Sequence, residues 1–153
     1  MITLEPVGVV VGGRREAIDD EWGAVEAVIR LDAERFGADA VAGLDEFSHL
    51  VVVYQFHLVG EAAVQTRARR PRGNPAWPEV GMFAQRAKMR PNRLGVSTCA
   101  LLGSDGLDLS VRGLDAVDGS PVLDVKPFMR EFDPPAGEVR QPAWATELMR
   151  GYF

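Results

Sequence analysis

Two histidines and one cysteine are the first residues of this 153-residue chain whose chemistry can be weighed from sequence alone. His49 and His57 are eight residues apart, so on one continuous strand they would lie about 26 Å apart, too far to share a metal ion. His49, beside Ser48, is typical of a structural hydrogen-bonding residue. His57 precedes a long loop and is the stronger candidate for chemistry. Cys99 stands in an apolar stretch without a neighbouring base, which is typical of an inert core thiol. We therefore expect no metal site.

Common catalytic and nucleotide-binding motifs are missing from the sequence. We find no Gly-x-Ser-x-Gly elbow, no P-loop and no Gly-x-Gly-x-x-Gly after a strand, so no Rossmann-type cofactor site is predicted. Three other segments combine charge with turns: 86–97 places cations and a proline before a strand, 114–121 places two carboxylates at a tight turn, and 124–127 pairs Asp124 with Lys126. Each can be explained by turn chemistry or a weak surface ion pair. Three of them in one small protein favour a shared site.

Charge is distributed unevenly along the chain. The net charge is −5, but residues 67–93, which we call the basic loop, carry +7 and the remainder carries −12. A cationic segment on an acidic body can attract an anionic ligand locally. The alternative is a solvated loop whose cations pair with acidic residues of the chain or of a second subunit.

Length and composition indicate one globular domain over residues 1–153. The longest strongly apolar stretch, Leu50–Tyr54, is far shorter than the roughly 20 residues of a membrane helix. The N-terminal segment has no basic region typical of a signal peptide, and a single cysteine excludes an intrachain disulfide. We expect a cytoplasmic protein.

Several short apolar stretches separated by Gly and Pro predict a mainly β protein, with a compact β-barrel-like fold and short helices. The predicted strands are 6–11, 25–31, 47–58, 80–84, 94–102, 107–111 and 122–125. Residues 38–44 and the C-terminal segment 142–150 are expected to form short helices, and 60–78 an irregular loop. Residues 103–106 are expected to form a turn.

Several ordered blocks of the sequence resemble the TsaA-like (TrmO) family. They are Pro6-Val-Gly-Val9, Glu46-Phe-Ser-His-Leu50, Tyr54-Gln-Phe-His57, Gly81-Met-Phe-Ala-Gln-Arg86, Arg90-Pro-Asn92, Leu94-Gly-Val-Ser97 and Asp115-Ala-Val-Asp-Gly-Ser-Pro-Val-Leu-Asp-Val-Lys-Pro127. The match spans about 6–128, followed by a tail over 129–153, and longer members carry a further C-terminal extension. Two blocks differ from the family's usual sequence. This chain has Gln85-Arg-Ala-Lys88 in place of Thr-Arg-Ser-Pro, and Arg90-Pro-Asn-Arg-Leu-Gly95 in place of Arg-Pro-Asn-Pro-Ile-Gly. The loop therefore loses two prolines and gains two cations.

The resemblance implies a homodimeric β-barrel that binds S-adenosyl-L-methionine and acts in tRNA processing. Characterised members methylate N6 of a threonylcarbamoylated adenosine beside the tRNA anticodon. The implied cofactor contacts are His57, Leu58, Arg86, Val96, Leu114, Asp115, Ala116, Val117 and Asp118, with a further segment at Asp20, Glu21 and Trp22.

Roles follow from the chemistry of methyl transfer. Carboxylates of Asp115 and Asp118 suit a cationic sulfonium, and either of them or His57 can take the acceptor's proton. Arg86 is expected to bind the cofactor carboxylate. The residues expected to hold RNA phosphates are Arg69, Arg70, Arg72, Lys88, Arg90 and Arg93. Trp77 suits either stacking of a splayed base or local packing. The alternatives are a different RNA or small-molecule acceptor, or a cofactor-binding or RNA-binding barrel without turnover.

Overall fold

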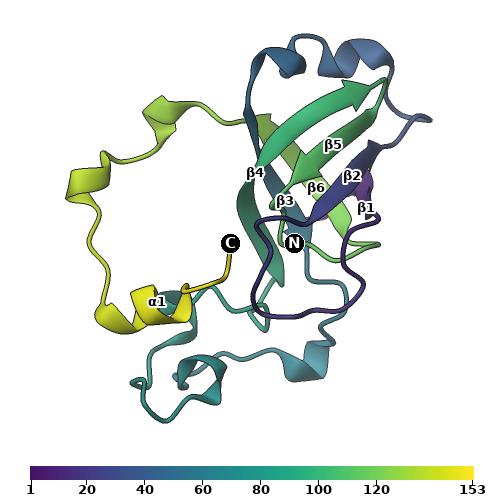
Figure 1. Ribbon diagram of the computed structural model, residues 1–153. Coiled ribbons are helices and arrows are strands. Elements are labelled where there is room, and N and C mark those ends of the chain that lie inside the picture. Colours follow the sequence, from purple (N-terminus) through teal and green to yellow (C-terminus); the bar gives the residue numbers. More distant parts are fainter.

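The computed structural model describes residues 1–153 and contains a closed six-stranded antiparallel barrel, which confirms the predicted fold class (Figure 1). The strands run in the order β1-β2-β5-β4-β3-β6, and β1 closes the barrel by pairing with both β2 and β6. Their bounds are β1 Gly8–Val11, β2 Glu26–Leu31, β3 His49–Gln55, β4 Leu94–Asp105, β5 Asp108–Arg112 and β6 Pro121–Pro127. Closure leaves no exposed strand edge.

Alternating side chains of the strands fill the barrel. Leu50, Val52 and Tyr54 of β3 point inward and are at most 1% exposed, and Ile29 and Leu109 meet them from β2 and β5. This period of two is what a strand with one face toward a core requires. Cys99 also lies in this core, as expected, and burial raises the pKa of its thiol to about 12.

Short helical segments connect the strands. The expected helix near residue 40 is a 3₁₀ helix at Ala38–Val41, and the C-terminal helix is α1, Ala143–Leu148. Further 3₁₀ helices occur at Leu44–Glu46, Glu61–Ala63, Pro71–Gly73, Met82–Ala84, Arg130–Phe132 and Ala136–Glu138. Residues 129–142 arc away from the barrel before α1 returns toward the basic loop (Figure 1). No helix is long and apolar enough to cross a membrane.

Two sequence-based assignments were wrong. Residues 80–84 do not form a strand: Val80 makes one isolated bridge to Arg69, and the chain then turns into a 3₁₀ helix. The Gln85 side-chain amide donates to the carbonyl oxygens of both Arg69 and Val80 and so holds this single bridge in place. Residues 103–105 are not a turn, because a bulge between Leu101 and Gly103 allows β4 to bend and continue pairing with β5.

Candidate functional site

The topology brings three distant segments to one end of the barrel. Because all neighbouring strands are antiparallel, the ends of β1, β3 and β5 lie beside the beginnings of β2, β4 and β6. Segments 12–25, 56–93 and 113–120 therefore all emerge at this end, which we call the loop end. Nearly all the residues expected to bind a cofactor belong to these segments.

Asp115 is the centre of the hydrogen-bond network at the loop end. Its Oδ1 accepts a hydrogen bond from the Ser97 hydroxyl, and the Tyr54 hydroxyl lies 3.0 Å from Oδ1 and 2.9 Å from the Asp115 carbonyl oxygen. Its Oδ2 accepts a hydrogen bond from the hydroxyl of Tyr152. Asp115 makes no salt bridge. The carboxylate is thus held by three neutral donors and lacks a cationic partner.

Tyr54 connects this network to the core. Burial, together with the neighbouring Asp115 carboxylate, raises the pKa of the Tyr54 hydroxyl well above its ordinary value. The ring lies against Gly95 so closely that a Cβ there would be 2.4 Å from its Cζ atom. Gly95 is therefore needed to admit the ring whose hydroxyl contacts Asp115.

The turn over 114–118 is anchored on both sides. Leu114, Ala116 and Val117 are buried, which roots the turn in the barrel. The Asp118 Oδ1 accepts the backbone N–H of Gly12 at 2.8 Å, closing the turn onto the end of β1. The structure thus places these expected contact residues together, although three of them face the interior.

The segment at residues 20–22 joins the turn through Arg14. The Asp118 backbone N–H donates to the Arg14 carbonyl oxygen, while the Arg14 guanidinium donates to the carbonyl oxygens of Asp20 and Glu21. The same guanidinium lies over the Trp22 ring, 4.5 Å from its centroid. This segment therefore lies at the loop end with the other expected residues.

His57 lies just beyond β3, in the turn that begins the long loop. A Cβ on Gly119 would be 3.5 Å from its Nε2, so the ring faces the 114–118 turn across a glycine. Its Nδ1 is buried without a hydrogen-bond partner. Leu58 next to it is 62% exposed. A buried nitrogen without a partner is unusual in a folded protein and is satisfied when a ligand or water binds.

Arg86 and Val96, both expected to contact the cofactor, are neighbours in the structure. The Arg86 guanidinium donates to the Val96 carbonyl oxygen at 2.7 Å, and both residues are exposed. The hydrogen bond uses one donor of a five-donor group, so the others face solvent. Arg86 can therefore bind an anion without breaking this contact.

Most arginines of the basic loop contact uncharged acceptors of the chain. Arg70 donates to the carbonyl oxygens of Pro75 and Trp77, and Arg90 to that of Gln85. Arg93 donates to the carbonyl oxygen of Val59 at 2.8 Å, and Arg69 contacts the sulfur of Met89. Carbonyl oxygens leave the guanidinium charge uncompensated, so these contacts order the loop and keep it cationic.

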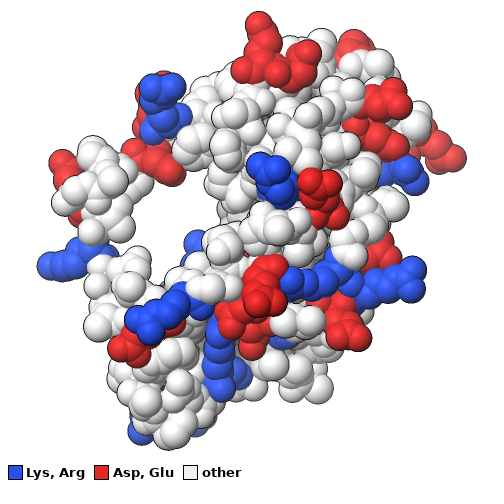
Figure 2. Space-filling view, in the orientation of Figure 1, with Lys and Arg blue, Asp and Glu red and all other residues white.

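Arg72 differs from these arginines because it pairs with acidic residues. Its guanidinium contacts both carboxylate oxygens of Asp20, at 3.0 and 3.3 Å, and approaches Asp19 at 3.9 Å. Lys88 makes no hydrogen bond or salt bridge with the rest of the chain. In Figure 2, Lys and Arg concentrate in the lower half of the molecule with acidic side chains among them, whereas the upper part is mainly acidic.

Sequence reasoning missed Tyr152. The 142–150 pattern predicted a helix but nothing about the residues after it, and 37 positions separate Tyr152 from Asp115. Trp77 also has a clear structural role, because its indole N–H donates to the Glu147 carboxylate of α1 at 2.8 Å. Asp124 and Lys126 form the expected surface ion pair at 2.7 Å.

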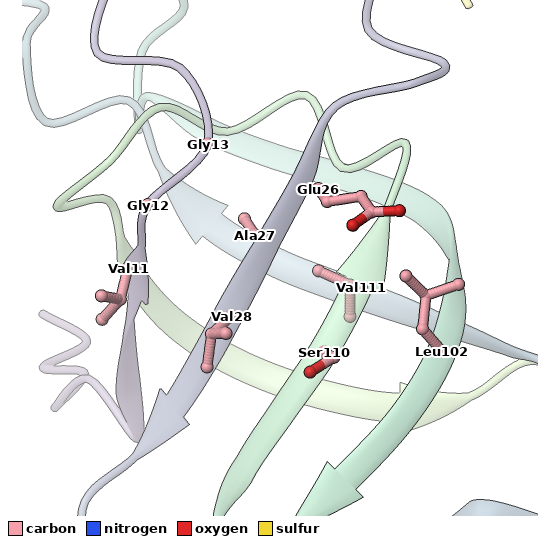
Figure 3. Close-up of a pocket in the computed structure, with 9 residues that line it drawn as sticks. All are labelled: Val11, Gly12, Gly13, Glu26, Ala27, Val28, Leu102, Ser110 and Val111. Carbon is pink, nitrogen blue, oxygen red and sulfur yellow. The ribbon is translucent and has the colours of Figure 1, made fainter.

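Two grooves on the protein surface lie outside this network. One, of about 280 Å³, follows the outer side of β1, β2, β5 and β4 and is lined by residues such as Val28, Ser110 and Leu102 (Figure 3). The other lies at the opposite end of the barrel, beside Arg30 and Asp108. Neither groove contains an unpaired buried polar group, so the chemistry at the loop end is the better indicator of function.

Comparison with known proteins shows the family to which the chain belongs. The family model for the tRNA-methyltransferase O (TrmO) N-terminal domain matches residues 20–134. A "probable S-adenosyl-L-methionine-binding protein" of Methanothermobacter thermautotrophicus is 38% identical over 86% of this chain and 93% of its own length. The tRNA (adenine(37)-N6)-methyltransferase of Escherichia coli is 36% identical over 82% of this chain and 57% of its own length.

Solved structures give the same result. The crystal structure of TrmO from Pseudomonas aeruginosa superposes with a TM-score of 0.72 at 26% identity, covering 92% of this chain and 61% of that one. This chain thus spans less than two thirds of the length of the methyltransferases it matches. The matched barrel and the shared sequence blocks establish that the chain belongs to the TrmO family, through its N-terminal domain.

Proposed function

We propose that this protein is an S-adenosyl-L-methionine-dependent methyltransferase that modifies N6 of a threonylcarbamoylated adenosine next to the anticodon of tRNA. The observation that carries the proposal is the Asp115 carboxylate, which three hydroxyl groups hold at the loop end without a cationic partner, in the same group of segments as Arg86 and His57. Names of relatives add support, since those of E. coli and mammals are called tRNA (adenine(37)-N6)-methyltransferases.

The residues at the loop end fit S-adenosylmethionine chemically. The ligand carries a sulfonium cation, an amino-acid carboxylate and several hydrogen-bonding groups. The loop end offers a carboxylate without a salt bridge at Asp115, an exposed guanidinium at Arg86 and an unpartnered nitrogen at His57. Each of these three protein groups thus has a complementary group in the ligand.

When bound, S-adenosylmethionine supplies an electrophilic methyl group. Around it the protein mainly aligns groups and stabilises charge. Asp115 provides negative charge for the sulfonium, and Arg86 binds the carboxylate. The proton that leaves the acceptor nitrogen needs a base. Of the three candidates, Asp115 and Asp118 already accept hydrogen bonds from the chain, whereas the His57 side chain makes no hydrogen bond. His57 is therefore the proposed proton acceptor.

The basic loop is the proposed surface for the tRNA backbone. Arg69, Arg70, Arg90 and Arg93 are ordered by sulfur or carbonyl contacts that leave their charges available, and Lys88 has no partner. Arg72 contributes less to this surface, because the Asp20 carboxylate pairs with its guanidinium and neutralises the charge. Phosphate contacts of this kind position an RNA, while the reacting base is selected at the loop end.

A cytoplasmic homodimer is the proposed form of the protein. Support comes from large exposed apolar side chains on the arc 129–142, where Met129, Phe132 and Val139 are 42%, 85% and 56% exposed. Exposed apolar patches often mark interaction surfaces. The second candidate function is cofactor binding without turnover, which the name of the M. thermautotrophicus relative favours.

Calorimetric titration with S-adenosylmethionine tests the cofactor site. We expect Arg86→Ala to weaken binding about tenfold or more, because a hydrogen bond to a charged group contributes about 1.5–3 kcal/mol. Arg112→Ala, an exposed arginine on β5, is the matched control. Equal affinities of Arg86→Ala and the parent protein would refute the role of Arg86.

The RNA surface is tested by the salt dependence of tRNA binding. Replacing Arg69, Arg70 and Arg90 with Ala removes three cations, so the slope of log K against log salt concentration should become shallower by about 2–3. Replacing Arg30 and Arg35 at the opposite side of the barrel is the control. An unchanged slope in the triple variant would place the RNA elsewhere.

A further inference from the structure

The last residues of the chain are docked against the loop end by their backbone. The N–H groups of Glu21 and Trp22 donate to the carbonyl oxygens of Gly151 and Tyr152, at 2.9 and 2.7 Å. At Gly23, a Cβ would be 2.6 Å from the carbonyl carbon of Phe153, so only glycine admits the tail there. Figure 1 shows the C-terminus returning from α1 to the side of the barrel. The tail is thus a fixed part of the loop end.

Tyr152 is the only group in the chain that holds the second oxygen of Asp115. Ser97 and Tyr54 both approach Oδ1, which leaves the carboxylate able to rotate about its Cβ–Cγ bond. The Tyr152 hydroxyl, arriving from a different segment, donates to Oδ2 and fixes the plane of the group. Burial and the neighbouring Asp115 carboxylate raise the pKa of the Tyr152 hydroxyl well above its ordinary value, and the more weakly acting Arg86 and Arg72 oppose this.

We propose that Tyr152 is a positioning residue of the cofactor site, whose hydroxyl orients the Asp115 carboxylate toward the sulfonium cation of S-adenosylmethionine. This inference rests on the proposed function. The three groups that hold the Asp115 carboxylate are uncharged hydroxyls, so none of them neutralises it, and an oriented carboxylate acts more strongly on a cation than a rotating one. The effect is specific to the cation: S-adenosylhomocysteine lacks the methyl group and has a neutral thioether, and is otherwise the same molecule.

The ratio of affinities for these two ligands therefore isolates the role of Tyr152. Tyr152→Phe keeps the ring, the backbone contacts and the packing against Phe153, and removes only the hydroxyl. We expect it to lower the affinity for S-adenosylmethionine relative to S-adenosylhomocysteine by about three- to tenfold. Asp115→Asn, which removes the charge, should lower the ratio at least as much. Both ligands are titrated by calorimetry, so the measurement needs no turnover.

Thr146→Val is the matched control because it removes an exposed hydroxyl from α1 whose only side-chain partner is Gln141. It should leave the ratio unchanged. A Tyr152→Phe variant that melts near the parent temperature with an unchanged ratio would overturn the inference. So would tighter binding of both ligands, since that would make the tail a competitor for the site. If the parent protein binds neither ligand, the proposed cofactor fails and the inference fails with it.

Discussion

Gly95→Ala tests the contact that couples the barrel core to the Asp115 network. A Cβ at this position would lie 2.4, 2.7 and 2.8 Å from three atoms of the Tyr54 ring, well inside van der Waals contact. The ring is 1% exposed and is held at its far end by Asp115, so it cannot move aside without breaking that contact. Overpacking of a core costs about 1–3 kcal/mol, and the lost hydrogen bond adds about 1 kcal/mol.

We therefore expect Gly95→Ala to lower the free energy of unfolding by about 2–4 kcal/mol, measured by urea denaturation. With a slope of about 2 kcal/mol per molar urea, the midpoint falls by about 1–2 M. Gly103→Ala is the matched control: it lies in the same strand, and a Cβ there meets no atom within 4 Å. A loss below about 0.5 kcal/mol in Gly95→Ala, similar to an ordinary surface substitution, would refute the reasoning.

Three further predictions concern titration, reactivity and the docking of α1. The pKa values of Tyr54 and Cys99 are raised in the folded protein. Their contribution to stability is therefore complete below their unfolded pKa values of about 10 and 8.5, and it is lost as the pH rises above them. The urea midpoint should fall between about pH 8.5 and 11, and a constant midpoint would contradict this. At pH 8 the Cys99 thiol should react with iodoacetamide about a thousandfold more slowly in the native than in the urea-unfolded protein, and comparable rates would show that it is accessible. Glu147→Ala removes the acceptor of the Trp77 indole, so limited proteolysis of the basic loop should be about fivefold faster. The control Glu138→Ala, on the exposed arc, should leave the rate unchanged. Equal rates in the two variants would mean that α1 does not hold the loop.

Local pattern predicted the barrel strands well because their alternation reflects the inside and outside of a closed sheet. The strand at Leu50–Tyr54 and the turn at Asp118-Gly119 needed no long-range information. Residues 80–84 have the composition of a strand, but only Val80 finds a backbone partner, Arg69, and a local pattern does not show which segment lies opposite.

The site residues could be predicted from sequence where they lie in the blocks that resemble the family. Asp115, His57 and Arg86 are far apart in sequence, and the antiparallel topology explains why their segments share one end of the barrel. Tyr152 was not predictable, because its role depends on how the arc 129–142 returns the tail to the barrel. The basic loop was predicted as a charge pattern, whereas its internal use of arginines to hold carbonyl oxygens became visible only in the structure.

The most direct test of the proposed activity is transfer of a labelled methyl group from S-adenosylmethionine to tRNA. The purified protein is incubated with tRNA that carries threonylcarbamoyladenosine, and the nucleosides are analysed by mass spectrometry. We expect the label on N6 of that nucleoside, with a loss of about 100-fold in His57→Asn, as removal of a general base produces. Label absent from the tRNA, in a protein that binds S-adenosylmethionine, would contradict the methyltransferase proposal and favour binding without turnover.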